Sequence, residues 1–426
     1  MPDASVPVRY FTLAWAIDLE HGGMTSALLR RSRMFAEGFG TTVTILTFDR
    51  ERDYDVIRQG LRDRGLLPDG VDLLNLWEWL AARPGVAAIT DERPGRGRRT
   101  VRLLAADGTV LRQWRTAWAL YTSWVNALRD GGRAVMIADS KPVARFLATY
   151  RRRDVVTAHV MHGSHLGADG REFSAARRPA VERIDEFDLV AVLTQQQRAD
   201  LARRIGRRPH VRVLPNAIDP IRSAPGTGER RGGVVLASLT PRKRVPHAVR
   251  AVARARELGA STELDVYGDG PARRAVEAEA RHAPWVRLHG YDPRASASLG
   301  ERSYLLLTST SEGSPLAVLE ALAAGCLPIA YDIPFGPRDV IRDGVNGFLV
   351  PAGDVDAMAA RIAELHARPP ADVAEMRRRA VATVAGYSEG AVFAIWQREL
   401  RAAWHRKTGV IPRARRVLRR RFAAAA

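Results

Sequence analysis

The chain is poor in cysteine and contains no long apolar segment. Its single cysteine among 426 residues, Cys326, excludes a disulfide within the chain. No uninterrupted apolar run reaches the length of about 18 residues that a membrane-spanning helix requires, so no such helix is expected. Residues 1–10 lack the apolar core and the small-residue cleavage site of a secretory signal peptide. These absences together predict a cytoplasmic protein.

Acidic residues are also few relative to basic ones. The 47 Asp and Glu residues face 66 Lys and Arg residues, which leaves a formal net charge of +19. Six arginines lie between positions 413 and 421, so most of the excess is spread over the rest of the chain. A strongly positive field attracts polyanions, such as nucleic acid, an anionic membrane or an acidic polymer. The alternative is an arginine-rich codon usage without functional meaning.

Signatures of common nucleic-acid-binding and metal sites are absent as well. The chain lacks a recognisable helix-turn-helix, zinc finger or aromatic RNA-binding pattern, which weakens a nucleic-acid-binding interpretation of the charge. Two Asp-x-Asp pairs occur, at 53–55 and 354–356. The second pair is predicted to lie at the start of a helix, where acidic side chains are favourable. Neither suggests a metal site.

Short β-rich apolar runs alternate with longer helical patterns, which is typical of a parallel sheet covered by helices. Strands are expected at 10–17, 42–47, 134–138, 155–159 and 189–193, and again at 234–239, 264–267, 286–288, 305–308 and 327–331. A polar stretch rich in Pro and Gly separates the two series. We therefore expect a first domain over 1–216, a second over 217–387, and a C-terminal helix with a basic tail over 388–426. Tandem α/β domains suggest a ligand cleft between them.

Residues 50–116 do not follow this alternation. Asp107-Gly108 lies between the apolar runs Thr100–Leu104 and Thr109–Trp114. Glycine tolerates the positive φ of a tight hairpin turn, so the pair is a strong hairpin signal. The segment is predicted to be an antiparallel insertion in the first domain.

The segment after the expected strand at 305–308 has the pattern of an anion-binding helix start. Ser314 is a good N-cap, and Pro315 suits the first helical position. Gly313 leaves room for a ligand to approach the backbone. The free amides of Ser314, Leu316 and Ala317, with the helix dipole, would suit a diphosphate.

Two glutamates flank this helix start. Glu312 precedes the helix and is placed to face a sugar. Glu320 lies five residues beyond Pro315, about 7.5 Å along the axis, where it is placed to accept hydrogen bonds from both ribose hydroxyls. The alternative is that Glu-Gly-Ser-Pro is ordinary helix capping.

Three elements together resemble glycosyltransferase family 4: Glu312 and Glu320 with seven residues between them, Gly-Asp-Gly at 268–270, and the motif Asp343–Val350. The resemblance covers nearly all of residues 9–405. It implies an α/β protein of the GT-B fold, with two Rossmann-like domains facing a cleft. It also implies a nucleotide-sugar co-substrate held mainly by the second domain, retention of anomeric configuration, no metal and no further cofactor.

The resemblance also implies roles for single residues. Glu312 would contact the donor sugar, Glu320 the ribose, and Lys243 the diphosphate. Ser238 stands where the family usually has a second diphosphate-binding arginine, so Arg242 or Arg244 is expected to supply that charge. Ser238 is also the one support for an alternative, a catalytically inactive GT-B partner subunit. The expected donor-binding residues are Gly22, Gly23, Arg242, Lys243, Gly268, Gly313, Ser314, Pro315, Leu316 and Glu320.

The first domain contributes a histidine loop. Family members usually have one histidine near the reacting centre in this position, for which His162 is the first choice and His165 the second. With Glu312 and Lys243, His162 completes the expected catalytic set. Thr25, after the two glycines, is expected to border the acceptor. Three histidines at 159, 162 and 165 suggest a metal site as the alternative, but no cysteine or paired carboxylate lies beside them.

A narrower resemblance is to the poly(glycerol-phosphate) α-glucosyltransferases of teichoic acid synthesis. It rests on the hairpin insertion and on residues 22–25, 71–78, 193–197 and 331–337. It implies transfer of a hexose, with glucose the first choice, from a UDP-linked donor to a polyol-phosphate polymer or another anionic glycan of the cell envelope. In that group the insertion helps assembly, so a homo-oligomer is a further expectation.

The C-terminal tail has an amphipathic pattern. Ile411, Ala414, Leu418 and Phe422 recur at helical spacing among the arginines. A basic amphipathic helix over 411–422 would lie on an anionic membrane surface, here the inner face of the cell membrane. The alternative is a disordered basic end.

Overall fold

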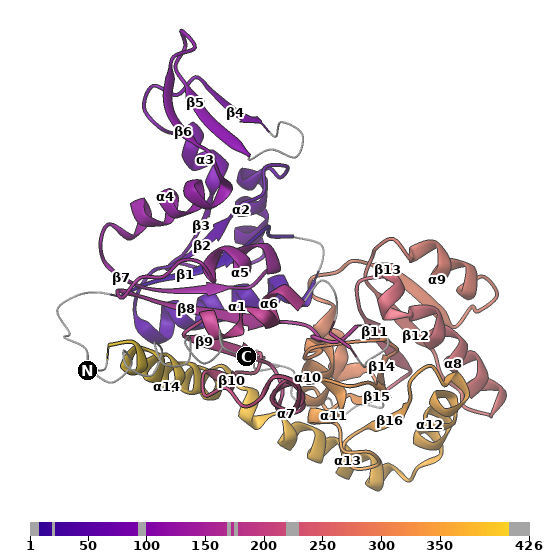
Figure 1. Ribbon diagram of the computed structural model, residues 1–426. Helices are drawn as coiled ribbons and strands as arrows, with labels where there is room; N and C mark the ends of the chain where they lie inside the picture. The colour runs from indigo at the N-terminus through magenta and orange to yellow at the C-terminus, as the bar shows by residue number, and fades with distance from the viewer. Residues whose placement is uncertain are drawn as a thin grey trace.

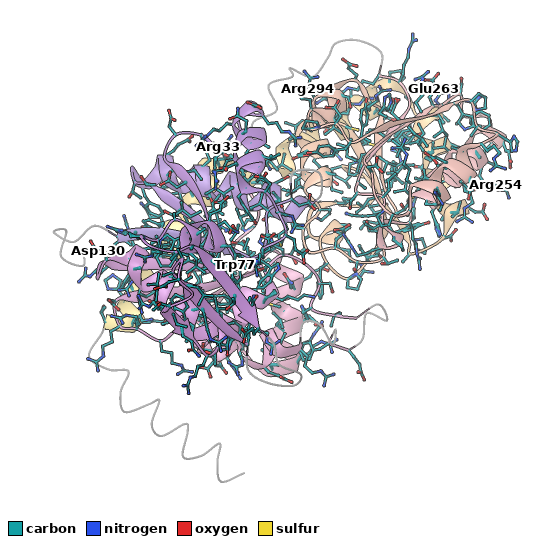
Figure 2. All side chains as sticks on the ribbon, turned by 90° about the horizontal axis from the view of Figure 1, so that it is seen from above. Arg33, Trp77, Asp130, Arg254, Glu263 and Arg294 are labelled. Atoms are coloured by element: carbon teal, nitrogen blue, oxygen red, sulfur yellow. The ribbon has the colours of Figure 1, made fainter. Side chains whose placement is uncertain are left out.

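Two α/β domains lie side by side in the computed structural model, as Figures 1 and 2 show from two directions. The structure describes residues 8–18, 22–92, 99–167, 172–173, 178–218 and 230–408. The expected linker begins after Asn216, and its residues 219–229 lie outside the described residues, as does the expected tail helix at 411–422. Within them, no helix combines the length and the apolar character needed to cross a bilayer.

The first domain is built on a parallel sheet of seven strands in the described residues, in the order β10-β9-β8-β7-β1-β2-β3. The strands are β1 (Val8–Ala14), β2 (Val43–Thr47), β3 (Val71–Asn75), β7 (Arg133–Ala138), β8 (Val155–Met161), β9 (Leu189–Val192) and β10 (Val211–Val213). The inner strands β7, β8 and β9 are nearly continuous apolar runs because helices cover both faces of the sheet. Separate clusters of buried apolar side chains occupy the two faces.

The helices of the first domain alternate with these strands. They are α1 (Gly23–Phe39), α2 (Tyr54–Asp63), α3 (Leu76–Ala81), α4 (Ala117–Arg129), α5 (Lys141–Leu147), α6 (Arg178–Glu182), the 3-10 helix η1 (Ile184–Glu186) and α7 (Gln195–Ile205). Polar N-caps start several of them: Asp53 accepts from the amides of Asp55 and Val56 at the start of α2, and Thr194 accepts from Gln197 at the start of α7.

The second domain has a parallel sheet of six described strands in the order β13-β12-β11-β14-β15-β16, over one apolar core. Its strands are β11 (Gly233–Leu236), β12 (Leu264–Tyr267), β13 (Val286–Gly290), β14 (Tyr304–Leu307), β15 (Leu327–Asp332) and β16 (Phe348–Pro351). Its helices are η2 (Pro241–Lys243), α8 (Val245–Glu257), α9 (Arg273–Ala280), η3 (Ala295–Glu301), α10 (Leu316–Ala323), α11 (Pro337–Val340), α12 (Val355–Ala367), α13 (Pro370–Thr383) and η4 (Ala385–Tyr387). Asp354 caps α12 by accepting from the Ala357 amide, so the prediction of a helix-start acid is confirmed.

A small antiparallel sheet projects from the first domain (Figure 1). It consists of β4 (Ala88–Glu92), β5 (Thr100–Leu104) and β6 (Val110–Trp114). The predicted hairpin is present, with Gly108 at φ +81° in the turn. The prediction that the insertion spans all of 50–116 was too wide, because β3 pairs in parallel with β2 in the main sheet. At the edge of that sheet, buried and exposed residues alternate along β3, as they do in an antiparallel strand.

The last helix, α14 (Glu389–Thr408), returns to the first domain and runs along it (Figure 1). Trp396 and Trp404 are buried in one of the first domain's apolar clusters. Gly38 of α1 permits this packing, because a Cβ there would overlap the ring of Phe393. Ile218 forms a backbone bridge with Ser388, so the two connections between the domains lie next to each other.

Candidate active site

A cavity of about 960 Å³ lies between the domains. It is lined by the loop before α1 and the loop after β8 in the first domain, and by the loops after β11, β12 and β14 and the start of α10 in the second. The carboxyl ends of parallel strands therefore face one another across it, which is where open α/β sheets bind ligands.

The helix start at this cavity differs from the prediction by one residue. Helix α10 begins at Leu316, and Pro315, with φ −71° and ψ 107°, occupies the N-cap position. The Pro315 carbonyl accepts from the amides of Val318 and Leu319, so it is the first intrahelical acceptor. Ser314 is thus not the N-cap, and Pro315 is not the first helical residue. Ser314, Leu316 and Ala317 all line the cavity, so the amides of these three residues remain the expected donors of the anion site.

Lys243 and Glu312 meet on the second-domain wall. Lys243 Nζ lies 2.6 Å from Glu312 Oε1, and Arg242 Nη1 lies 3.3 Å from the same oxygen. Burial raises the pKa of Glu312, but Lys243 and Arg242 outweigh this effect and hold the pKa below its ordinary value. Glu312 is therefore a carboxylate at neutral pH, able to accept hydrogen bonds but not to donate a proton.

The two arginines considered for the missing charge are separated by the structure. Arg242 and Ser238 both line the cavity. Arg244 takes a left-handed conformation, with φ 45°, and its guanidinium lies near Gly353, outside the cavity lining. Of the two arginines, only Arg242 is positioned to act on a ligand in the cleft.

Glu320 lines the cavity from α10, one turn beyond the helix start. Arg30 of α1 reaches it from the first domain, with Nη2 at 3.4 Å from Glu320 Oε1. The same arginine donates to the carbonyl of Ala217, at 2.9 Å, close to the connection between the domains. A ligand that engages Glu320 would therefore compete with a contact between the domains.

Glycines bring the walls together. Gly268, at φ +139°, packs on the loop after β11, since a Cβ there would overlap the carbonyl oxygen of Ala237. At Gly313 a Cβ would overlap the carbonyl oxygen of His162 in the first domain. Gly313 also lines the cavity, as expected, but the position that its Cβ would take faces the histidine loop. Gly313 thereby lets the Glu312 loop touch the His162 loop.

His162 lines the cavity and is held from behind by a buried ion pair. Its Nε2 lies 2.6 Å from Oδ1 of Asp139, the residue that follows β7. Arg31 of α1 donates to both oxygens of Asp139, at 2.9 and 2.6 Å. Burial raises the pKa of Asp139, but Arg31 and then His162 overcome this and lower it. Sequence reasoning missed Asp139 and Arg31, although a carboxylate directly after an apolar strand was a usable signal.

The other two histidines of this loop serve the scaffold. His165 is fully buried, bonds Asp200 through Nε2 at 2.6 Å, and stacks on Phe335 of the second domain with ring centroids 4.9 Å apart. It does not line the cavity, so the structure gives no support to His165 as the second choice for the histidine near the reacting centre. His159 bonds the Ala138 carbonyl. With three different partners, the histidines do not converge, and no group of metal-binding side chains occurs in the described residues.

The glycine loop of the first domain forms the facing wall. Gly22, Gly23 and Thr25 all line the cavity, as expected. Gly22 has φ +116°, which glycine tolerates best, and α1 begins at Gly23. A Cβ at Gly23 would lie 3.8 Å from Leu316, so this loop sits directly opposite the helix start of α10.

Parts of the chain are similar to a protein family and to known proteins. Residues 231–368 match the family described as "Glycosyl transferases group 1". The chain is 32% identical over 247 residues to an exopolysaccharide phosphotransferase of Streptomyces coelicolor, covering 56% of this chain and 25% of that protein. It is 23% identical over 214 residues to the poly(glycerol-phosphate) alpha-glucosyltransferase of Bacillus subtilis, covering 48% of this chain and 32% of that protein. The chain thus spans a third or less of the length of these two relatives.

Among solved structures, the chain is similar to S. aureus TarM, solved as a variant in complex with fondaparinux, alpha-GlcNAc-glycerol and UDP. The TM-score is 0.78 at 18% sequence identity, covering 92% of this chain and 99% of TarM. The GT-B fold predicted from the sequence is thereby confirmed.

Proposed function

We propose that this protein is a retaining glycosyltransferase that moves a hexose, with glucose the first choice, from a UDP-linked donor to a polyol-phosphate polymer or a similar anionic glycan of the cell envelope. One observation carries the proposal. The interdomain cavity joins an amide-lined helix start, the Lys243–Glu312 pair and Glu320 on one wall with His162 and the glycine loop on the other. This set offers separate groups for a diphosphate, a ribose and a sugar.

The donor half of the proposal rests on charge and spacing. The amides of Leu316 and Ala317 with Lys243 and Arg242 would hold the two phosphates, and Glu320 would accept from the ribose hydroxyls. UDP is the first choice of nucleotide because TarM, which shares the fold, was solved with UDP.

The acceptor half rests on the similarity to the poly(glycerol-phosphate) alpha-glucosyltransferase and on the net charge of +19. A basic surface raises the local concentration of a phosphate polymer and speeds encounter. Attachment of the tail to the membrane and assembly into oligomers are further parts of the same proposal.

The residues divide the chemistry as follows. Lys243 and the helix start stabilise the negative charge that builds on the diphosphate as the bond from the anomeric carbon to the diphosphate oxygen breaks. The acceptor oxygen attacks the anomeric carbon from the face of the sugar that the diphosphate leaves. The proton of the acceptor hydroxyl passes to the departing diphosphate oxygen. The ionised Glu312 accepts hydrogen bonds from sugar hydroxyls, and His162 orients the sugar from the first domain. No metal takes part in this scheme.

The first experiment is a thermal-stability titration with UDP, GDP, ADP and their hexose conjugates. A ligand that binds only the folded state raises the melting temperature, by an amount set by its concentration relative to Kd. We expect UDP and a UDP-hexose to raise it, and the matched nucleotides with other bases to leave it unchanged. A shift with another base would correct the donor.

Two outcomes would point to the alternatives. Donor binding without hydrolysis or transfer to polyol-phosphate polymers would identify an inactive partner subunit. The absence of any nucleotide effect in folded protein, together with salt-sensitive DNA binding, would identify a nucleic-acid-binding protein.

A further inference from the structure

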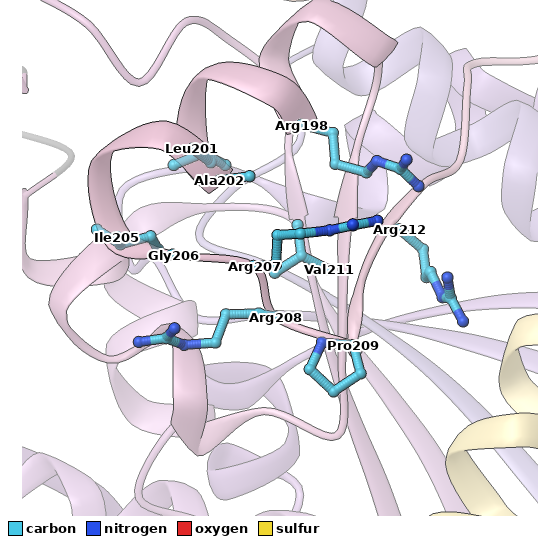
Figure 3. A pocket seen from close by; sticks show the side chains of 10 residues that line it. All are labelled: Arg198, Leu201, Ala202, Ile205, Gly206, Arg207, Arg208, Pro209, Val211 and Arg212. Carbon is cyan, nitrogen blue, oxygen red and sulfur yellow. The ribbon is translucent and has the colours of Figure 1, made fainter.

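A second, smaller cavity lies at the C-terminal end of α7, outside the interdomain cleft (Figure 3). It has a volume of about 330 Å³. Leu201, Ile205 and Val211 contribute apolar surface to its lining. Four of its other lining residues are arginines: Arg198, Arg207, Arg208 and Arg212. The mechanism of sugar transfer uses none of these side chains.

The charges in this pocket are only partly neutralised. Arg208 pairs with Asp185 at 2.8 Å, and Arg212 lies 3.0 Å from Glu399, which Arg398 also approaches at 3.1 Å. Within the part of the chain that the structure describes, Arg198 and Arg207 form no ion pair. Figure 3 shows Arg198, Arg207 and Arg212 extending to one side of the pocket and Arg208 to the other. The side with three guanidinium groups therefore carries surplus positive charge.

The chemistry of the lining selects the ligand. Guanidinium groups bind phosphate oxygens through paired N–H donors, and their charge strengthens each bond. Apolar surface beneath them would pack against carbon atoms rather than against water. A repeat unit in which a phosphate alternates with a short carbon chain matches both features. The end of α7 also carries the negative pole of the helix dipole, which favours a cluster of arginines there.

The pocket is physically connected to the catalytic cleft through α7. At the start of this helix, Gln197 donates to the carbonyl of Gly163, at 3.0 Å, next to His162. The amide of Gln196 donates to Asp339 of the second domain, at 3.1 Å. Helix α7 has 11 residues and is about 16 Å long, so Arg207 and Arg208, which follow its C-terminal end, lie about one helix length from the histidine loop. Arg198 lies in the first turn of α7, directly after Gln197.

We propose that this pocket binds a phosphate group of the anionic acceptor polymer, at a repeat remote from the one that receives the sugar. The proposal builds on the proposed function, since it assigns a second contact to the same acceptor. Holding the chain at two places makes arrival at the catalytic cleft an intramolecular step, which raises the effective concentration of the acceptor group.

The test is the double variant Arg198→Gln/Arg207→Gln. Its matched control is Arg274→Gln/Arg281→Gln at α9. These two arginines are exposed and lie outside both cavities, and their replacement removes the same two positive charges. Binding of a long poly(glycerol phosphate) is titrated without any donor. We expect Kd to rise about tenfold in the double variant and less than twofold in the control, because both lose the same net charge but only the double variant loses contacts to phosphate.

Steady-state kinetics separate the pocket from the catalytic cleft. With the long polymer we expect KM to rise about tenfold at unchanged kcat, and with a single-repeat acceptor no change, because only remote binding is removed. Equal loss with the single-repeat acceptor, or equal loss in the control variant, would overturn the proposal. Saturation of the pocket by inorganic phosphate without any effect on polymer affinity would do the same.

The failures of the two proposals are distinguishable. If no sugar donor supports transfer but polymer binding still depends on Arg198 and Arg207, the proposed activity fails and the pocket stands. If the double variant transfers sugar to the long polymer with the wild-type KM, the proposal for the pocket fails and the proposed activity stands. Binding of anionic lipid vesicles through the same two arginines, with none of the polymer, would reassign the pocket to a membrane surface.

Discussion

The two walls of the cleft each contain a carboxylate paired with cations, but the two groups differ in how much of their side chains is exposed. Asp139 is fully buried, and Arg31, with 7% of its side chain exposed, satisfies both of its oxygens. Glu312 is 9% exposed, while its partners Lys243 and Arg242 are 15% and 45% exposed and line the cavity. The first group is a fixed support, whereas the second can exchange its internal partners for a ligand.

This difference assigns separate tasks to the walls. A diphosphate entering the cleft would draw Lys243 and Arg242 toward itself and leave the Glu312 carboxylate to the sugar hydroxyls. No comparable exchange is open to Asp139, because replacing Arg31 would leave buried charges without partners. The second-domain wall should therefore control turnover directly, and the first-domain wall should act through the position of His162.

The largest expected effect is on the exchangeable group. Lys243→Ala should lower kcat/KM for transfer about a thousandfold, because a cation is removed where leaving-group charge develops. The melting temperature should change little, since Arg242 remains beside Glu312. Steady-state kinetics with the UDP-hexose identified by the titration, alongside calorimetry, would check both parts. Retained turnover in Lys243→Ala and in Glu312→Ala would refute the assignment of this wall.

The fixed group should show a smaller catalytic effect combined with a loss of stability. Asp139→Asn should lower kcat about a hundredfold and the free energy of unfolding by about 3 kcal/mol, because Arg31 is left charged and buried without a carboxylate. Denaturant unfolding and kinetics on the same preparation would test this.

A further measurement tests whether Asp139 acts on catalysis by positioning His162 or through a general loss of structure. If Asp139 acts on catalysis through His162, the double variant Asp139→Asn/His162→Ala should have nearly the kcat of His162→Ala alone. Fully additive losses would contradict the positioning role.

Because the pKa of Asp139 is depressed in the folded state, the stabilisation that Asp139 gives the fold is complete well above the ordinary pKa of 3.8 and is lost as pH falls below that value. The stability difference between wild type and Asp139→Asn should therefore shrink in acid.

Glu320 should affect donor affinity more than chemistry. Glu320→Gln should raise Kd for UDP about tenfold, since a charge-assisted hydrogen bond to the ribose becomes a neutral one. The thermal shift produced by UDP should fall accordingly, while the shift produced by a phosphate-bearing ligand without ribose stays the same. An unchanged UDP affinity would place the ribose elsewhere in the cavity.

The smallest expected effect distinguishes two neighbouring arginines. Arg242→Gln should lower kcat/KM about fivefold, because an exposed cation on the cavity wall contributes modestly to the diphosphate site. Arg244→Gln, the matched change just outside the cavity lining, should stay within about twofold of wild type. Equal losses of kcat/KM at both positions would indicate a general effect of charge. A larger loss for Arg244→Gln would mean that the loop after β11 changes conformation and brings Arg244 into the cavity when donor binds.

The sequence by itself was sufficient for the architecture and for most of the second-domain wall. Alternation of apolar runs and helical patterns follows directly from burial in a parallel sheet, so most strands of both sheets were predictable. The strands β3, β10 and β16, all at sheet edges, were not predicted. The local chemistry of Lys243, Glu312, the α10 start and Glu320 is carried by residues near in sequence or in a recognisable order. The hairpin at Gly108 was predictable for the same reason, since a tight turn is decided by its own residues.

Only the tertiary structure decided how distant residues meet. Arg31 and Asp139 are separated by 108 positions, and Arg30 and Glu320 by 290, so no local pattern reports either pair. Gly313 was expected to make room for a ligand, yet its missing side chain admits the His162 loop. His162 and His165 lie three positions apart in one loop, but packing places His165 against Phe335 and leaves His162 at the cavity. Side-chain type and spacing determine local structure, while contacts across the cleft depend on how the two domains pack together.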